Sequence, residues 1–138
     1  ESHLPVITAV NGVAAGAGFG IALLGDLSIV SSAAKFRPAF IALGAVPDLG
    51  LAYSLPRLIG VQQAAKLFYT SRRITGEEAL AIGLADEVVS LADVRKRAQE
   101  FAAEIATNAP LAVQRTRETI RSGLADKVKA QTDHESRV

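Results

Sequence analysis

Several residue types are missing from this sequence, and each absence removes a class of chemistry. The chain of 138 residues contains no cysteine, no methionine and no tryptophan. Without cysteine it cannot form disulfides, thiolate metal sites or a thiol nucleophile, and this fits a reducing, cytoplasmic environment. Any catalysis must therefore use oxygen, nitrogen or backbone groups.

An excess of charge of one sign is also missing. Lys and Arg number 15 and Asp and Glu number 14, which leaves a formal net charge of +1. No strong positive field is available to bind a nucleic-acid backbone or an anionic membrane. The longest apolar stretch, residues 12–25, is shorter than the roughly 20 residues of a membrane-spanning helix and is interrupted by glycines. The sequence predicts neither a nucleic-acid partner nor a membrane partner.

The remaining composition is that of a folded domain. Hydrophobic residues make up 49% and charged residues 21% of the chain, which can supply a core. The sequence begins with Glu1 rather than Met, and its last helical pattern ends at Val138 without a stop signal. We therefore expect an excerpt of a longer chain.

The residue pattern predicts strands and helices in alternation. We expect a buried strand over residues 5–10, a loop of small residues, and a helix over residues 19–24. Two further strands are predicted, one at residues 26–31 and one beginning at Lys35, followed by helices at residues 47–56 and 61–69. The capping box Thr75–Glu78 predicts a short helix that Gly83 closes, and residues 84–89 are expected to be extended. The last predicted elements are helices after Asp93, after Asn108 and from Leu124.

The small-residue loop is the first candidate site. Gly16-Ala17-Gly18 leads into a helix, so its backbone N–H groups could face a phosphate or a developing oxyanion. It is not a dinucleotide fingerprint, because the third glycine of that pattern would fall at Ile21. Close packing of the helix on a strand explains the glycines equally well.

Asp48 is the second candidate, because it lies in an otherwise apolar segment. A pocket there could make it an acid or base, whereas its place after Pro47 is also typical of a residue that caps a helix. From the residues alone we favour the cap. Tyr53 could face the same cavity, and both Tyr53 and Tyr69 are expected to be core residues on helices.

The other charged residues are expected at the surface. The histidines, His3 and His134, are isolated and form no metal-binding cluster, so no metal site is predicted. The solvent-facing groups expected are the charged tail Asp133, His134, Glu135 and Arg137, and the basic clusters Arg95-Lys96-Arg97 and Arg115, Arg117 and Arg121.

The order of the motifs resembles that of one known family. The matching segments are residues 5–18 (PVITAVNGVAAGAG), 25–27 (GDL), 34–36 (AKF), 43–47 (LGAVP), 55–60 (LPRLIG) and 74–89 (ITGEEALAIGLADEVV). They resemble the enoyl-CoA hydratase/isomerase, or crotonase, family. The resemblance implies an α/β fold, the crotonase-like ββα superhelix, represented here by its central and C-terminal part. It implies a partial core at residues 1–89 and a helical C-terminal region at residues 90–138.

The resemblance also implies an acyl-CoA substrate. In that family two backbone N–H groups hold the thioester carbonyl oxygen, and one of them corresponds to Ala17, with Gly16 and Gly18 beside the substrate. The other belongs to an earlier segment of the family pattern, outside residues 1–138. Coenzyme A is then part of the substrate and no cofactor is bound. A homotrimer or homohexamer is the assembly expected.

Departures from the family pattern indicate the subclass. Gly20 and Phe40 stand where hydratases of the family carry their two glutamates. Asp48 stands where isomerases similar to the phenylacetate-pathway ring-epoxide isomerase place an acid/base aspartate, and Ala39-Phe40 also resembles that group. The resemblance therefore implies an isomerase of fatty-acid or phenylacetate metabolism, with Asp48 as acid/base and with Phe40 and Tyr53 at the substrate.

Three other functions remain open. A dehalogenase of the 4-chlorobenzoyl-CoA type would use Asp48 as a nucleophile, and the chain resembles it around Tyr53-Ser54-Leu55. That group, however, is associated with a tryptophan where Phe40 stands. An ordinary enoyl-CoA hydratase is the second alternative. An acyl-CoA-binding or assembly subunit without catalysis is the third.

Overall fold

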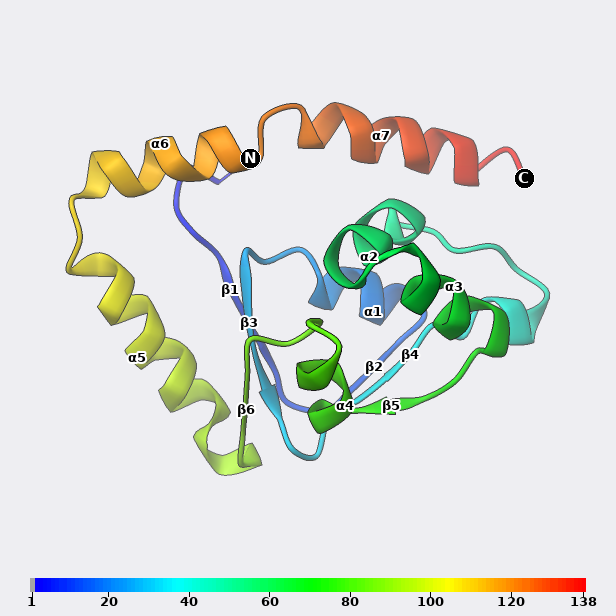
Figure 1. Ribbon diagram of the computed structural model, residues 1–138, viewed down its shortest axis with the longest axis horizontal. Helices are drawn as coiled ribbons and strands as arrows, with labels where there is room; N and C mark the ends of the chain where they lie inside the picture. The colour runs from blue at the N-terminus through cyan, green and yellow to red at the C-terminus, as the bar shows by residue number, and fades with distance from the viewer. Residues whose placement is uncertain (1) are drawn as a thin grey trace.

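Two three-stranded sheets form the centre of the structure, a computed structural model that describes residues 2–138 (Figure 1). The first sheet is parallel, in the order β1-β3-β6, and the second has the order β2-β4-β5, with β5 antiparallel to β4. The strands are β1 (Ile7–Val10), β2 (Val13–Ala15), β3 (Leu27–Ser31), β4 (Lys35–Arg37), β5 (Ile74–Thr75) and β6 (Glu87–Val89).

Helices cover these sheets and continue beyond them. They are α1 (Ala17–Ala22), α2 (Leu51–Ile59), α3 (Val61–Thr70), α4 (Gly76–Ala81), α5 (Val94–Ala106), α6 (Pro110–Ile120) and α7 (Leu124–Glu135), with short 3-10 helices at Ile41–Leu43 and Leu91–Asp93. Helix α5 packs on β1 and β3, and α7 returns over α2 (Figure 1). The C-terminal helix therefore contacts an element from the middle of the sequence.

The core lies between the second sheet and helices α1 to α4. Phe19 on α1 and Phe36 on β4 are buried, with ring centroids 5.3 Å apart. Leu51, Leu55 and Ile59 place a buried stripe along one side of α2, at the spacing of one helical face. This core fixes α1 and the start of α2 relative to one another.

Several predicted elements are confirmed. The strand at residues 26–31 is β3, the strand beginning at Lys35 is β4, and the helix at 61–69 is α3. The capping box is present, because Thr75 accepts the Glu78 N–H while the Glu78 carboxylate accepts the Thr75 N–H. Each of these signals is contained within a few consecutive residues.

Predictions for the first strand and the small-residue loop are wrong in detail. Strand β1 is only half-buried, because it is an edge strand of its sheet. The loop contains a further strand, β2, which pairs in parallel with β4. The sequence does not indicate this strand, because the loop around it is rich in Gly and Ala and its pairing partner β4 is distant in sequence.

The predicted helix at residues 47–56 is also shifted. Leu49 and Gly50 both have positive φ, at 52° and 69°, so the helix cannot begin before Leu51. Asp48 is therefore not its cap; the N-cap residue is Gly50, which has no side chain to accept a hydrogen bond. Pro56 does not end α2, which continues to Ile59 because burial of its apolar stripe outweighs the one backbone hydrogen bond that proline removes.

An ion-pair cluster attaches α6 to the start of β3. Asp26 accepts hydrogen bonds from Arg117 at 2.8 Å, from Arg121 at 2.9 Å and from the Val6 N–H at 2.8 Å. Arg117 also donates to the Ser2 carbonyl. Only 11% of the Arg117 side chain and 23% of the Arg121 side chain are exposed, so the prediction of a solvated basic face is wrong for these two residues.

This cluster makes stability depend on pH. Partial burial alone would raise the pKa of Asp26, but the hydrogen bonds from Arg117 and Val6 and the charges of both arginines hold that pKa below its ordinary value. A carboxylate with a lowered folded-state pKa stabilises the fold above its unfolded pKa of about 3.9, and this contribution is lost as the pH falls through the folded pKa.

We expect Asp26→Asn to lower the free energy of unfolding at pH 7 by about 1–3 kcal/mol, because two buried arginines lose their charged acceptor. The difference between wild type and variant should shrink as the pH falls below about 4, because the unfolded chain then binds a proton at Asp26 that the folded protein, with its lowered pKa, binds only at lower pH. Urea unfolding of both proteins at pH 7 and pH 3 measures this. A difference that is equal at the two pH values would contradict the assignment.

Two further findings concern membrane-spanning helices and the predicted domain boundary. Within residues 2–138, no helix has the length and apolar character needed to cross a membrane. After β6 ends at Val89 the described chain is helical or irregular. A domain boundary at residues 89–90 stays a prediction.

Candidate active site

The N-terminus of α1 presents free backbone donors. Gly16, at φ 54°, turns the chain from β2 into the helix, and its N–H donates to the Arg37 carbonyl at 3.0 Å. The Phe19 and Gly20 N–H groups donate back to the Gly16 carbonyl. Within residues 2–138, the N–H groups of Ala17 and Gly18 have no acceptor, and both residues are exposed. They are suited to hold an oxyanion.

The core holds these donors in place. Strand β2 pairs with β4 up to the Ala15–Arg37 register, directly before Gly16. On the other side, the fully buried Phe19 ring packs on Phe36 of the same strand. The turn at Gly16 is therefore anchored at both ends, which fixes the direction of the two free N–H groups.

Asp48 lies in a loop, residues 45–50, that packs against α1, and it is exposed. The neighbouring Leu49 lies over Gly20, so that a Cβ added at Gly20 would be 3.3 Å from the Leu49 Cβ. Gly20 is one helical turn after Ala17. The contact therefore places the Asp48 loop beside the helix that carries the free donors.

The same contact leaves little room for a side chain at position 20. A Cβ at 3.3 Å from the Leu49 Cβ is tighter than an ordinary van der Waals contact, and a glutamate side chain would need space that Leu49 fills. The absence of a side chain at Gly20 thus leaves space for the Leu49 side chain. Asp48 is the titratable group next to this contact in the chain.

Helix α7 holds the other side of the loop. A Cβ at Gly50 would lie 2.8 Å from Cγ1 of Val128, so only glycine fits there. Glu135, also on α7, is 7% exposed and accepts hydrogen bonds from the Gly50 N–H at 3.0 Å and from the Ala52 N–H at 3.4 Å. The prediction that Glu135 belongs to a solvated tail is wrong.

The sequence of α7 does contain a signal for Glu135. Leu124, Val128 and Glu135 fall on one face of the helix, and all three are at least half-buried. A carboxylate on the apolar face of a helix indicates a buried partner. The partner itself, at Gly50, could not be identified from local sequence.

Phe40 and the two tyrosines lie in different environments. Phe40 is 9% exposed and belongs to the main apolar core, directly before the 3-10 helix Ile41–Leu43. Tyr53 is half-buried in the first turns of α2, and its hydroxyl accepts a hydrogen bond from Arg57 at 3.4 Å. Tyr69 is 77% exposed, so its prediction as a core residue is wrong.

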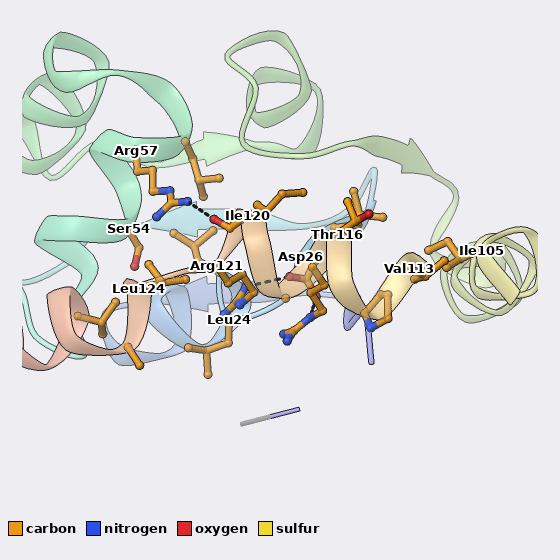
Figure 2. Close-up of a pocket in the computed structure, with 18 of the residues that line it drawn as sticks. Leu24, Asp26, Ser54, Arg57, Ile105, Val113, Thr116, Ile120, Arg121 and Leu124 are labelled. Carbon is orange, nitrogen blue, oxygen red and sulfur yellow. Dashed lines mark hydrogen bonds and ion pairs between the residues drawn. The ribbon is translucent and has the colours of Figure 1, made fainter. Parts of the chain in front are cut away.

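A cavity of about 850 Å³ lies between the end of α1, helix α2 and the C-terminal helices (Figure 2). Figure 2 shows Asp26 facing Arg121, and Arg57 reaching the Ile120 carbonyl. Of the predicted site residues, Tyr53 lines this cavity, whereas Asp48 and Ala17 do not. The carboxylate in its lining, Asp26, is held by two arginines, so the cavity offers space for an apolar group rather than a free acid or base.

Metal-binding residues do not cluster in the part of the chain that is described. Among residues 2–138, no group of three or more His, Cys, Asp or Glu side chains could hold a metal ion. The groups present at α1 and its neighbouring loop are the free N–H groups of Ala17 and Gly18 and the exposed carboxylate of Asp48.

Comparison with known proteins supplies the family. A family model described as enoyl-CoA hydratase/isomerase matches residues 1–138. The short-chain-enoyl-CoA hydratase of Clostridium acetobutylicum is 41% identical over 120 residues, which are 87% of this chain and 46% of that protein. The carnitinyl-CoA dehydratase of Proteus mirabilis is 41% identical over 122 residues, which are 88% of this chain and 47% of that protein.

A solved structure shows the same fold. The crystal structure of an enoyl-CoA hydratase/isomerase from Pseudoalteromonas atlantica matches with a TM-score of 0.91 and 31% identity, over 99% of this chain and 55% of that one. The predicted crotonase-like α/β fold is confirmed. The chain spans about half the length of the curated relatives it matches.

Proposed function

Because the chain belongs to the enoyl-CoA hydratase/isomerase family, we propose that the protein is an acyl-CoA isomerase in which Asp48 is the acid/base. It shifts a double bond in an unsaturated acyl-CoA ester or isomerises a ring epoxide. One observation carries the proposal: Leu49 packs on Gly20 and sets the Asp48 loop against the helix with the free donors, at the position where a hydratase glutamate would need room.

The reaction needs one base and one oxyanion site. The Asp48 carboxylate removes a proton from the carbon next to the thioester carbonyl, or from the γ carbon. The electron pair moves onto the carbonyl oxygen, which accepts a hydrogen bond from the Ala17 N–H. The protonated Asp48 then returns the same proton to a different carbon, and the double bond re-forms at its new place. A second donor, which the family resemblance assigns to a segment outside residues 1–138, completes the oxyanion site.

The other site residues support proton relocation over water addition. Hydration needs a positioned water molecule and a group that deprotonates it. Gly20 has no side chain, and Phe40 is buried in the core, so neither position activates water. Asp48 is exposed and accessible to a substrate.

Hydration is the second candidate function. It is favoured by the names of the relatives from Clostridium acetobutylicum and Proteus mirabilis, a hydratase and a dehydratase. The dehalogenase and the non-catalytic subunit are alternatives that the test below also separates.

We expect the full-length protein to isomerise a β,γ-unsaturated acyl-CoA faster than it hydrates crotonyl-CoA, by about 10²-fold, the usual contribution of one acid/base group. Absorbance of the conjugated thioester reports both reactions on one preparation. Hydration that equals or exceeds isomerisation would overturn the isomerase assignment. Halide release from a chlorobenzoyl-CoA would instead indicate the dehalogenase, and binding without turnover would indicate the assembly subunit.

We propose the same partners for the protein as for the family that it resembles. Coenzyme A enters as part of the substrate, without a separately bound cofactor. A homotrimer or homohexamer is the assembly proposed, and sedimentation equilibrium of the full-length protein would measure it.

A further inference from the structure

Glu135 is a buried carboxylate bound to backbone N–H groups. Its Oε2 accepts the Gly50 N–H at 3.0 Å and its Oε1 accepts the Ala52 N–H at 3.4 Å. Within residues 2–138, no Lys, Arg or His side chain forms an ion pair with it. Burying an unpaired carboxylate is costly in general, so this arrangement persists only where its hydrogen bonds offset the cost.

The start of α2 supplies the compensation. Gly50 is the cap of this nine-residue helix, and the helix dipole places partial positive charge where the Glu135 carboxylate lies. The two N–H groups that it binds are among those that a helix leaves without intrahelical partners. Glu135 thus caps α2 from a different helix.

The residue next to the cap is strained. Leu49 has φ 52°. This is a left-handed conformation, which costs a non-glycine residue roughly 1–2 kcal/mol. Without restraint, Leu49 would relax to negative φ and change the direction of the chain at Asp48. Two contacts restrain Leu49. Glu135 accepts a hydrogen bond from the N–H of the next residue, Gly50, and the Leu49 side chain itself packs against Gly20.

We propose that Glu135 is a positioning residue, which holds the Asp48 loop beside α1 by anchoring the backbone at Gly50 and Ala52. This inference rests on the proposed acid/base role of Asp48. Glu135 itself does not touch the substrate. It acts through the two hydrogen bonds that fix the end of the Asp48 loop.

The kinetic test uses three variants of the full-length protein. Glu135→Ala should lower kcat about 10- to 100-fold with KM changed less than about twofold, because a displacement of about 1 Å has costs of this order. Glu135→Gln keeps one acceptor oxygen and should fall between wild type and Glu135→Ala. The control, Asp133→Asn, removes an exposed carboxylate from the same helix, where it pairs with Lys129 at 2.7 Å, and should leave kcat unchanged.

Hydrogen exchange tests the anchor without using activity. The Gly50 and Ala52 amides should exchange at least about tenfold faster in Glu135→Ala than in wild type, because opening exposes groups that the carboxylate now protects. Unchanged exchange would overturn the proposal. Faster exchange with an unchanged kcat would also overturn it, since Glu135 would then be structural only. A failure of the proposed function shows itself separately, as normal turnover in Asp48→Asn.

Discussion

Replacing Asp48 by asparagine should lower isomerase turnover in the full-length protein by about 10²–10⁴-fold, or more if the same group serves in both proton transfers. The amide has nearly the same size as the carboxylate but cannot remove a proton. Asp48 is exposed and, because Gly50 caps α2, it has no capping duty. Melting temperature and acyl-CoA affinity should therefore stay near wild type.

Two companion variants sharpen this experiment. Asp126→Asn removes an exposed carboxylate at the start of α7 and should leave turnover unchanged. Asp48→Glu keeps the acid but moves it by one methylene, and should recover part of the rate. Near-normal turnover in Asp48→Asn, with the double-bond shift measured by absorbance, would rule out Asp48 as the proton carrier.

Sequence alone predicts the parts of this fold whose signals are local. The capping box works because Thr75 and Glu78 satisfy one another's backbone within a single turn. Strand β3 is equally clear as a short β-rich run. Strand β2 is not, because a run of one valine and two alanines is too short and too rich in alanine to indicate a strand, which forms by pairing with β4.

The residues of the candidate site also divide into those that the sequence indicates and those that only the structure reveals. Ala17 and Asp48 could be singled out because the family resemblance assigns them positions in known motifs. Glu135 could not, since the hydrogen bond to Gly50 joins residues 85 positions apart, and a carboxylate near His134 and Arg137 is typical of a surface tail. The positive φ of Leu49 is likewise a product of packing on both sides of the loop, which no local pattern encodes.

Ala17 offers an unusually clean test of the oxyanion site. It is the first residue of α1, where proline is well tolerated because the N–H has no intrahelical partner. The preceding Gly16 has φ 54° and ψ -125°. That conformation is outside the α region that a following proline disfavours, and glycine carries no Cβ to clash with the ring. Ala17→Pro should therefore remove the donor without unfolding α1.

We expect Ala17→Pro to lower turnover by at least about 10²-fold, which is the usual effect of losing one oxyanion donor. The charge on the thioester oxygen develops only as the proton leaves, so the loss should be in kcat rather than in ground-state affinity. Ala17→Gly keeps the N–H and should retain most of the rate, which separates the missing donor from a change in side-chain volume. Circular dichroism and melting temperature check the fold of both variants. A well-folded proline variant with unchanged kinetics would show that the oxyanion is held elsewhere, and would separate α1 from the chemistry proposed for Asp48.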